Sequence, residues 1–374
     1  MLSPKLFYEL LLEQDINFFV GVPDSILKSF CAYITDHTSK GNHIISANEG
    51  TAVGLAIGYH LATNKVALVY MQNSGLGNAI NPLLSLADRE VYSIPVLLMI
   101  AWRGEPDHKD EPQHKKQGRV MLSMIEAMEI SYQIITGDPE ATNCVIQKAA
   151  SYMKENRAPF ALIIREGTFE SYTSKDTQKL SFPLTREDAI KSIIDSLGEE
   201  DIVVCTTGMS SREVFEYREE LNCGHSRDFL TIGGMGHVSQ IALEIAKQKH
   251  NRKVFCFDGD GSAIMHMGAM ATNGAQKCEN FIHIVINNGA HGSVGGQPTV
   301  GFDINFKGVA KAVGYKTILG AETKEEINQS MDVLKKRKGP SFLEIRVNKG
   351  HRTDLGRPTM TPVEIKNEFM EFLN

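Results

Sequence analysis

The sequence predicts an α/β protein built from two similar, doubly wound parallel-sheet domains. Short, nearly continuous apolar runs alternate with amphipathic segments along all 374 residues. This alternation is typical of parallel strands that are covered by helices on both faces. One polar, aperiodic stretch interrupts the alternation near the middle of the chain, and half of the runs lie on each side of it.

Ten apolar runs are the candidate strands. The first half of the chain contains five of them, at residues 16–22, 43–47, 65–72, 94–101 and 159–165. The second half contains the other five, at residues 201–207, 228–232, 253–259, 280–288 and 340–347. With the helix-like segments between the runs, each half accommodates about six α/β units, so we expect two domains of similar architecture.

The polar stretch near the middle covers residues 167–184 and lacks hydrophobic periodicity. A new helix start follows it, because residues 185–188 read Thr-Arg-Glu-Asp, with acidic residues in the first turn. We therefore expect one domain at 1–170, a linker at 171–184 and a second domain at 185–374. The chain length fits two domains of ordinary size.

Composition and charge argue against several classes of protein. Hydrophobic residues make up 42% and charged residues 22% of the chain, as expected for a globular protein with a core. The net charge is -6 with acidic and basic residues mixed, which argues against binding to nucleic acid or to an anionic membrane. No apolar run reaches membrane-spanning length and the N-terminal residues lack a signal-peptide pattern, so we expect a cytoplasmic protein with no membrane partner.

The six cysteines are widely spaced, and no CxxC pair occurs in the sequence. This spacing favours neither disulfides nor a zinc site. Cys205 and Cys256 fall within apolar runs, so we expect both to be buried in strands.

A glycine-rich turn follows the apolar run that ends at residue 259. Gly259 and Gly261 allow the backbone to approach an anion closely, and Asp260 between them can hold a hard cation. The next run ends in Asn287-Asn288, 28 residues after Asp260. Because ligands bind at the carboxyl ends of parallel strands, the Asp and Asn oxygens can converge there. Together with a backbone carbonyl and phosphate oxygens, they suit an octahedral Mg²⁺.

Two alternatives exist for this pair of segments: a nucleotide-binding turn in another class of enzyme, or a tight turn with no ligand. A Gly-Asp-Gly turn alone is weak evidence, but its spacing from the Asn-Asn pair is more specific. The sequence contains no complete GxGxxG, since Gly75-x-Gly77 and Gly234-x-Gly236 both lack the third glycine. This absence weakens the dinucleotide-binding alternative.

The Gly-Asp-Gly and Asn-Asn segments resemble the signature of the thiamine diphosphate (ThDP)-dependent 2-oxo acid decarboxylase family. The resemblance implies ThDP and Mg²⁺ as cofactors, with the Asp260 and Asn288 side chains and the Ala290 carbonyl as protein ligands of the metal ion. It also implies that the first domain binds the aminopyrimidine ring and the second domain binds the diphosphate. The central domain found in many larger members of the family is not expected here.

Other cofactor contacts are implied by the same resemblance. The residues 231–240 are similar to a Gly-Ser-Met-Gly segment of the family, so Met235 is the candidate for the apolar wedge between the two cofactor rings. By itself, Met235 could equally be a core methionine. The implied contacts at strand ends are Thr207, Gly208, Met235, Gly259, Gly261 and Ser262.

Glu49 stands between the run at 43–47 and a helix-like segment in which Gly50, Gly54 and Gly58 recur at every fourth position. This spacing predicts one smooth helix face for close packing. By itself, Glu49 could be an acidic residue favoured at a helix start. The family resemblance instead implies that Glu49 binds N1′ of the aminopyrimidine ring and thereby activates the cofactor.

Glu49 and Asp260 lie in different halves of the chain. In the ThDP family, the cofactor bridges the pyrimidine-binding domain of one subunit and the diphosphate-binding domain of another. The resemblance therefore implies self-association into a homodimer or a larger homo-oligomer, with active sites at the interface.

Four further segments, at 21–28, 71–83, 103–118 and 354–362, resemble the members of the family that decarboxylate 3-phosphonopyruvate. The resemblance implies formation of phosphonoacetaldehyde and CO2 in phosphonate biosynthesis. This small-molecule 2-oxo acid carries a second anionic group, and its pocket needs cations and N–H donors. The segment 103–118 is rich in cationic side chains and follows a strand end, where we expect a shaped loop.

The expected substrate contacts are Asp24, Ser25, Arg103, Lys109 and His114. Asp24 and His114 are, with Glu49, the expected catalytic residues, because a positioned carboxyl or imidazole can transfer protons near neutral pH. Structural alternatives remain open at this point: Asp24 or Ser25 could cap a helix, and residues 103–118 could form a solvated charged loop.

Three other functions remain open as well. Sulfopyruvate decarboxylases share ThDP and a three-carbon substrate with two anionic groups, but their two halves are often separate subunits, whereas here they are fused. Carboligases of the acetolactate synthase type usually contain the central domain. A non-catalytic, nucleotide-binding α/β protein would leave Glu49, Asp260 and Asn288 without a common purpose.

Overall fold

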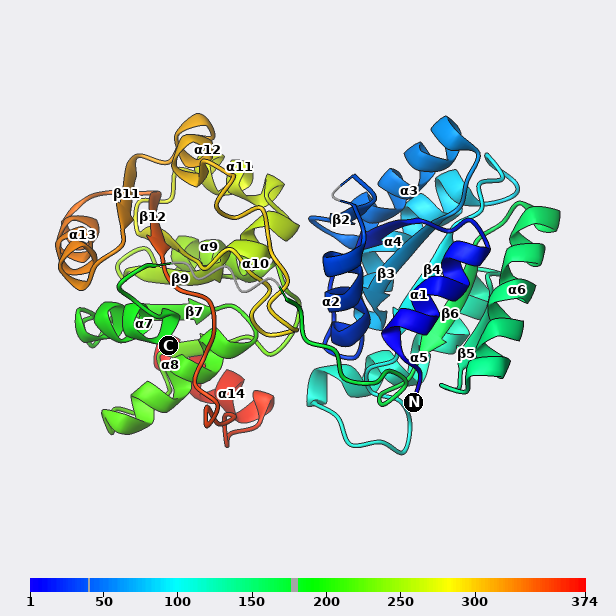
Figure 1. Cartoon of the computed structure of the whole chain (residues 1–374). Helices are drawn as coiled ribbons and strands as arrows, with labels where there is room; N and C mark the ends of the chain where they lie inside the picture. Colours follow the sequence, from blue (N-terminus) through cyan, green and yellow to red (C-terminus); the bar gives the residue numbers. More distant parts are fainter. Residues whose placement is uncertain (40, 176–180) are drawn as a thin grey trace. The chain divides into compact units, whose positions relative to one another are not determined.

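The computed structural model describes residues 1–39, 41–175 and 181–374. The chain divides into two compact units, Met1–Thr177 and Gln178–Asn374, and the described part of each contains a six-stranded parallel sheet (Figure 1). The expected fold class, two α/β domains with parallel sheets, is confirmed. The predicted linker, 171–184, includes residues 176–180, which lie outside the described residues, so the domain boundaries stay a prediction.

The sheet of the first unit has the strand order β2-β1-β3-β4-β6-β5, and every neighbouring pair is parallel. Its strands are β1 (Phe18–Gly21), β2 (His43–Ile45), β3 (Ala67–Gln72), β4 (Leu97–Ala101), β5 (Ser131–Ile135) and β6 (Phe160–Ile164). Its helical segments are α1 (Pro4–Glu13), α2 (Lys28–His37), α3 (Glu49–Thr63), η1 (Asn73–Gly75), α4 (Leu76–Pro82), η2 (Leu83–Ala87), α5 (Pro112–Ala127) and α6 (Pro139–Asn156). The strand order reverses between β1 and β3, which is where sheets of this type bind ligands, at the carboxyl ends of the strands.

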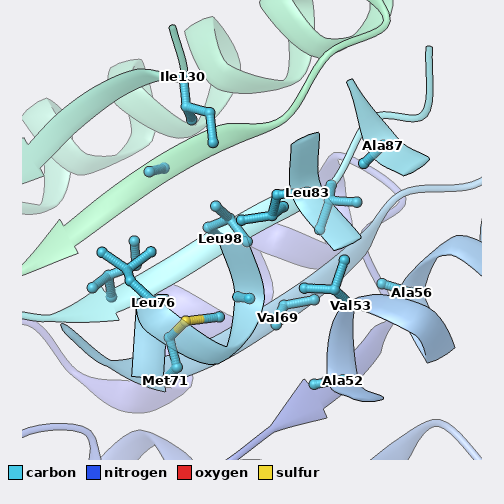
Figure 2. Close-up of a cluster of buried hydrophobic side chains, with 14 of the residues drawn as sticks. Ala52, Val53, Ala56, Val69, Met71, Leu76, Leu83, Ala87, Leu98 and Ile130 are labelled. Atoms are coloured by element: carbon cyan, nitrogen blue, oxygen red, sulfur yellow. The ribbon is translucent and has the colours of Figure 1, made fainter. Parts of the chain in front are cut away.

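Alternate side chains of β3 enter two different hydrophobic clusters, so both faces of this sheet are buried. Val69 and Met71 belong to the cluster under α3, α4 and α5, whereas Leu68 and Tyr70 belong to the cluster under α1, α2 and α6. Figure 2 shows the first cluster, to which β3 contributes Val69 and Met71 and α3 contributes Val53. Burying each such side chain contributes about 1.5–3 kcal/mol, so two layers of helices hold the strand ends in register.

The sheet of the second unit has the strand order β11-β12-β10-β9-β7-β8, again with every neighbouring pair parallel. Its strands are β7 (Ile202–Cys205), β8 (Asp228–Leu230), β9 (Val254–Gly259), β10 (Phe281–Asn287), β11 (Thr317–Ala321) and β12 (Ser341–Arg346). Its helices are α7 (Arg186–Asp195), α8 (Met209–Glu220), α9 (Val238–Gln248), α10 (Asp260–Met265), α11 (Gly268–Ala275), α12 (Phe306–Ala312), α13 (Lys324–Lys336) and α14 (Pro362–Leu373).

One hydrophobic cluster joins α7, α8 and α13 to the sheet of the second unit. Ile190, Val214 and Met331 of these helices lie in the cluster with Phe255 of β9 and Ile284 of β10. Helix α9 contacts β7, β9 and β10, and α12 contacts β11 and β12. This packing holds the central strands in place and so fixes the segments that follow their carboxyl ends.

Each of the ten predicted runs contains a strand. Two edge strands, β5 and β11, escape prediction because exposed residues such as Gln133 and Gly320 interrupt their apolar pattern. The helix start predicted at 185–188 is confirmed, since α7 begins at Arg186 with Thr185 as its N-cap and Asp188 completing a capping box.

Two smaller expectations have opposite outcomes. Cys205 and Cys256 lie buried in β7 and β9, as predicted. The loop expected at 103–118 is only partly correct, because α5 begins at Pro112 and its first turn includes His114. Proline suits the first turn of a helix, so this start has a local cause. Within the described parts of the chain, no helix is long and apolar enough to cross a membrane.

Candidate active site

The second unit gathers four of its strand ends beside one another. The strands β8, β7, β9 and β10 are neighbours in the sheet and run parallel, so the segments that follow them meet at one edge. This edge holds the predicted cofactor residues: Thr207, Gly208, Met235, Gly259, Asp260, Gly261, Ser262, Asn288 and Ala290.

Asp260 is a buried carboxyl at this edge, with 2% of its surface exposed. Burial raises the pKa of Asp260 to about 6, although the Thr299 hydroxyl and the N–H groups of Asn288, Gly261 and Asp260 itself all stabilise its charged form. Among the residues that the structure describes, the partners of this carboxyl are hydroxyl and N–H groups, and no ion pair to it is formed. Within the described chain, this carboxyl therefore has no ion-pair partner.

The two asparagines after β10 have different partners. The Asn287 amide is fully buried and donates to Glu344 Oε1 at 2.9 Å, which ties it to β12. Asn288 Oδ1 instead accepts the N–H of Ala290 at 3.0 Å. Because the N–H of Asn288 also bonds the Asp260 carboxylate, the turn at Asn288 and Ala290 lies directly beside Asp260.

Ser262 links three of the strand ends. Its Oγ accepts the hydroxyl of Thr206 at 3.1 Å and the N–H of Gly236 at 3.1 Å. Thr206 follows β7, and Gly236 follows the partly buried Met235 in the segment after β8. The predicted wedge residue Met235 thus directly precedes Gly236, whose N–H forms a hydrogen bond with Ser262 in the Gly-Asp-Gly-Ser turn.

Thr207 and Gly208 lie where the segment 290–301 approaches the end of β7. Gly208 has a φ of 94°, which favours glycine, and a side chain there would lie 2.5 Å from Ser293 Oγ. The same oxygen accepts the N–H of Met209 at 3.4 Å. The structure therefore brings Thr207 and Gly208 to the edge that holds Asp260.

Three polar residues at this edge, His291, Gln297 and Thr299, are not singled out by sequence analysis. The His291 ring packs against Gly261, and burial lowers its pKa to about 4, so the imidazole is neutral at physiological pH. Gln297 is buried, and its amide atoms have no hydrogen-bond partner in the described structure. All three stand within eleven residues of Asn288, so closeness to that motif is the signal that could have identified them.

The first unit has a corresponding edge. The strands β2, β1, β3 and β4 are neighbours, and the segments after them hold Glu49, Asp24 with Ser25, Gln72 at the end of β3, and Arg103. Glu49 is the first residue of α3, which Asn48 caps.

The Glu49 carboxylate is buried, with 5% of the residue exposed. The Asn78 amide donates to its Oε2 at 2.7 Å, and a side chain on Gly75 would overlap Oε1. An amide donor therefore holds one carboxylate oxygen, and the lack of a side chain at Gly75 leaves space beside the other. The close packing expected along α3 is found at Gly50 but not at Gly54 or Gly58, which have nothing within reach of a side chain in the structure described.

Asp24 lies in the loop after β1 and is 1% exposed. Its Oδ1 accepts the N–H of Ile26 at 2.8 Å and its Oδ2 accepts the Gln72 amide at 2.9 Å. Burial raises the pKa of Asp24, partly opposed by these donors and by nearby cations. The helix-cap alternative is wrong, because α2 begins at Lys28 with Leu27 as its N-cap.

Arg103 is held by two partners at this edge. Its Nε donates to Asp110 Oδ2 at 2.9 Å, and its Nη1 donates to Ser25 Oγ at 2.6 Å. His114 Nδ1 lies 2.8 Å from the other Asp110 oxygen. Arg103 is thus a paired cation, whereas Lys109 is exposed. His108, Lys115 and Lys116 are exposed as well, so the solvated alternative holds for this part of the segment 103–118.

The structure therefore brings Asp24, Ser25, Arg103 and His114 together and leaves Lys109 outside the cluster. Arg103 and His114 both lie near enough to Asp24 to lower its pKa against the effect of burial. Sequence analysis does not single out Asp110, which joins two of these residues.

Two family models match the chain. The N-terminal TPP binding domain of thiamine pyrophosphate enzymes matches residues 4–126, and the C-terminal TPP binding domain matches residues 206–345. Each match includes one of the two strand-end edges described above.

Three relatives illustrate the similarity at the level of whole proteins. A phosphonopyruvate decarboxylase of Streptomyces viridochromogenes is 28% identical over 94% of this chain and 90% of that protein. A sulfopyruvate decarboxylase of Methanosarcina acetivorans is 26% identical over 98% of this chain and 96% of that protein. The sulfopyruvate decarboxylase subunit beta of Methanocaldococcus jannaschii is 31% identical over 50% of this chain and 95% of that subunit. With both binding domains matched, the chain belongs to the thiamine pyrophosphate enzymes and is a decarboxylase of the phosphonopyruvate/sulfopyruvate type.

Proposed function

We propose that this protein decarboxylates 3-phosphonopyruvate to phosphonoacetaldehyde and CO2, with Mg²⁺ and ThDP as cofactors. The observation that carries the proposal is the buried Asp260 carboxyl, set between two glycines and beside Asn288, with no ion-pair partner in the part of the chain described. Such a carboxyl is poised to receive a cation from outside the chain.

The donor set at this edge fits a magnesium ion. A cation beside Asp260 would offset the burial that raises its pKa. Carboxylate, amide and carbonyl oxygens are ligands that Mg²⁺ prefers. We propose that Asp260, Asn288 Oδ1 and the Ala290 carbonyl hold the ion. The residues proposed to contact the cofactor itself are Thr207, Gly208, Met235, Gly259, Gly261 and Ser262.

ThDP, when bound, supplies a carbon nucleophile that also takes up the electrons released with CO2. The proposed part of Glu49 is to hold or share a proton with a pyrimidine nitrogen at Oε1, because Oε2 already accepts from Asn78. Gly75 supports this assignment, since a larger residue there would overlap Oε1. Such a proton must be placed within hydrogen-bond reach of the ring to be useful.

The residues of the first unit are proposed to handle the substrate. Asp24 and His114 would hold and move protons, and Ser25, Arg103 and Lys109 would bind anionic groups. Asp110 already accepts a hydrogen bond from Nε of Arg103. We therefore propose that Nη1 of Arg103, which donates to Ser25, binds the carboxylate or phosphonate of the substrate.

Phosphonopyruvate is preferred because four segments of the sequence resemble the enzymes that act on it. The second candidate is a sulfonate analogue, and it is favoured by the sulfopyruvate decarboxylase that aligns with nearly the whole chain. Assays of aldehyde and CO2 formation from phosphonopyruvate, sulfopyruvate and pyruvate, run side by side, separate these candidates. We expect the highest kcat/KM with phosphonopyruvate, and a decisive preference for pyruvate would overturn the anionic-pocket assignment.

We further propose that the protein self-associates and that Glu49 of one copy and Asp260 of another act on the same cofactor. The test combines Glu49→Gln and Asp260→Asn in equal amounts by co-expression. Activity is measured at ThDP and Mg²⁺ concentrations that saturate the native protein but leave each variant alone nearly inactive. If sites combine residues of two copies in a dimer, half the dimers are mixed and one of their two sites is intact, which restores about a quarter of native activity. No recovery in a verified mixed oligomer would contradict the shared site.

A further inference from the structure

The Asp110 carboxylate is the centre of the substrate-side cluster of the first unit. It accepts the N–H groups of Gly104 at 2.7 Å and Glu111 at 2.7 Å, in addition to Arg103 and His114. Only 12% of its side chain is exposed. Backbone and side-chain donors from the loop that follows β4 and from α5 thus converge on this carboxylate.

The contact with Asp110 determines which nitrogen of His114 carries the proton. An ionised carboxylate can only accept a hydrogen bond, so His114 Nδ1, at 2.8 Å from Asp110 Oδ1, must be the donor. Burial alone would raise the pKa of Asp110, but the hydrogen bonds from Arg103 and His114 hold that pKa well below its usual range. The carboxylate is therefore charged throughout the pH range in which the enzyme would work, and Nε2 is the nitrogen left to exchange a proton.

The same carboxylate fixes the direction of Arg103. Two guanidinium nitrogens, Nε and Nη2, donate to Asp110, which leaves Nη1 directed at Ser25. The Asn73 amide holds the Arg103 carbonyl at 2.7 Å, so the backbone at the base of this side chain is also held. Bidentate pairing of this kind restricts both position and plane of a guanidinium.

Two glycines allow the segment to lie this close to α5. Gly104 has a φ of 68°, and a side chain there would collide with the carbonyl of His114. A side chain on Gly118 would likewise collide with the carbonyl of Gly104. The backbone at Gly104 therefore packs directly against the first two turns of α5. This packing places His114 of α5 next to Asp110 and near Asp24.

From this geometry we infer that Asp110 is a positioning residue for the decarboxylation. It orients His114 with Nδ1 protonated, so that proton exchange with the substrate takes place at Nε2. The inference rests on the proposed function for the reaction itself. The arrangement of Asp110 and His114, however, can be measured without any turnover.

The first measurement is the tautomer of His114, read from ¹⁵N chemical shifts of the imidazole in protein labelled at histidine. The His114 signals are assigned by their loss in His114→Gln. At about pH 8.5, where an ordinary imidazole is neutral, we expect the native protein to show the Nδ1–H form and Asp110→Asn to lose it. A native His114 in the Nε2–H form would overturn the inference, whether or not the protein turns over phosphonopyruvate.

The second measurement separates kcat from KM with phosphonopyruvate. We expect Asp110→Asn to lower kcat by about 10²-fold, with a smaller change in KM and an intact thermal response to ThDP and Mg²⁺. The matched control is Asp107→Asn, an exposed aspartate in the same segment whose φ of 66° asparagine tolerates, and it should behave like the native protein.

A double-variant cycle shows whether Asp110 acts through His114. In the His114→Gln background, Asp110→Asn should lower kcat by less than about threefold, because the imidazole that it positions is gone. Equal losses in both backgrounds would show that Asp110 acts independently of His114 and would overturn the positioning role. Turnover absent in the native protein, together with the Nδ1–H tautomer, would refute the proposed function and leave the positioning of His114 supported.

Discussion

Asp110 and Asp260 stand at corresponding edges of the two units, yet their charges are balanced in opposite ways. Asp110 is paired with Arg103 and His114, and these hydrogen bonds outweigh burial and keep its pKa low. Asp260 is more deeply buried, and its hydroxyl and N–H donors only partly oppose the burial that raises its pKa to about 6. Asp110 has its counter-ions within the described chain, whereas Asp260 forms no ion pair there.

This difference indicates what each edge can bind. A carboxylate that already has its counter-ion serves to orient neighbouring side chains, because it gains little from another cation. A buried carboxylate without one gains most from a metal ion, and its cost in free energy falls when the ion binds. We therefore propose that the metal ion binds at the edge of the second unit and that the edge of the first unit orients the groups that meet the substrate.

The largest effect is expected at Glu49, a carboxylate that belongs to neither pattern because its described partner is the Asn78 amide. Glu49→Gln keeps the size of the side chain but cannot hold the proton in the same way. We expect kcat to fall by about 10³-fold while ThDP and Mg²⁺ still stabilise the protein. Steady-state rates and thermal melts check both parts, and near-native turnover would exclude the proposed role.

The second-largest effect is expected at Asp260 and tests its difference from Asp110 through the affinity for ThDP and Mg²⁺. Asp260→Asn should weaken the apparent affinity for ThDP with Mg²⁺ by about 100-fold, because the anionic ligand is lost. Titrations followed by the melting temperature measure this affinity.

The control for Asp260→Asn is Asp110→Asn, which removes a carboxylate from the other edge. This variant should keep the native cofactor affinity. Its free energy of unfolding, measured by urea denaturation, should instead fall by about 1–3 kcal/mol, because the Arg103 guanidinium loses its partner. Equal losses of cofactor affinity in the two variants would remove the distinction between the edges.

Sequence reasoning locates the second edge better than the first because its signal is local. Asp260 and Asn288 each follow a strongly apolar run, so a pattern of strand ends is enough to place them. Thr299 contacts Asp260 only after the chain has turned back toward the end of β9, and its closeness to Asn288 in the sequence is the local signal of that contact.

Asp110 is missed for a different reason. In the sequence it is one acidic residue in a charged segment, and such segments are usually solvated. Its partners come together only because the glycines at 104 and 118 allow the segment to fold onto α5. The strands β5 and β11 are missed because partly exposed residues interrupt the apolar pattern of each strand.

The smallest effect concerns Asp24, which is as buried as Asp260 but lies beside Arg103 and His114. Burial raises the pKa of Asp24 in the folded protein, so the folded state holds the proton more tightly than the unfolded chain. The resulting stabilisation is complete below the unfolded pKa of about 3.9 and is lost as pH rises through the folded-state pKa. Asp24→Asn does not titrate, so its melting temperature should rise relative to that of the native protein as pH increases above about 4.

Thermal melts of both proteins across that pH range, without cofactor, measure the gain of Asp24→Asn. The asparagine oxygen can still accept the N–H of Ile26, but its NH2 group meets the Gln72 amide. The change of the melting-temperature difference with pH, rather than its absolute size, therefore reports the charge. Asp107→Asn, at an exposed site of the same unit, should follow the native curve. A melting-temperature difference that does not change with pH would mean that Arg103 and His114 already balance Asp24, and the first edge would then be electrically complete at every carboxylate of its substrate-side cluster.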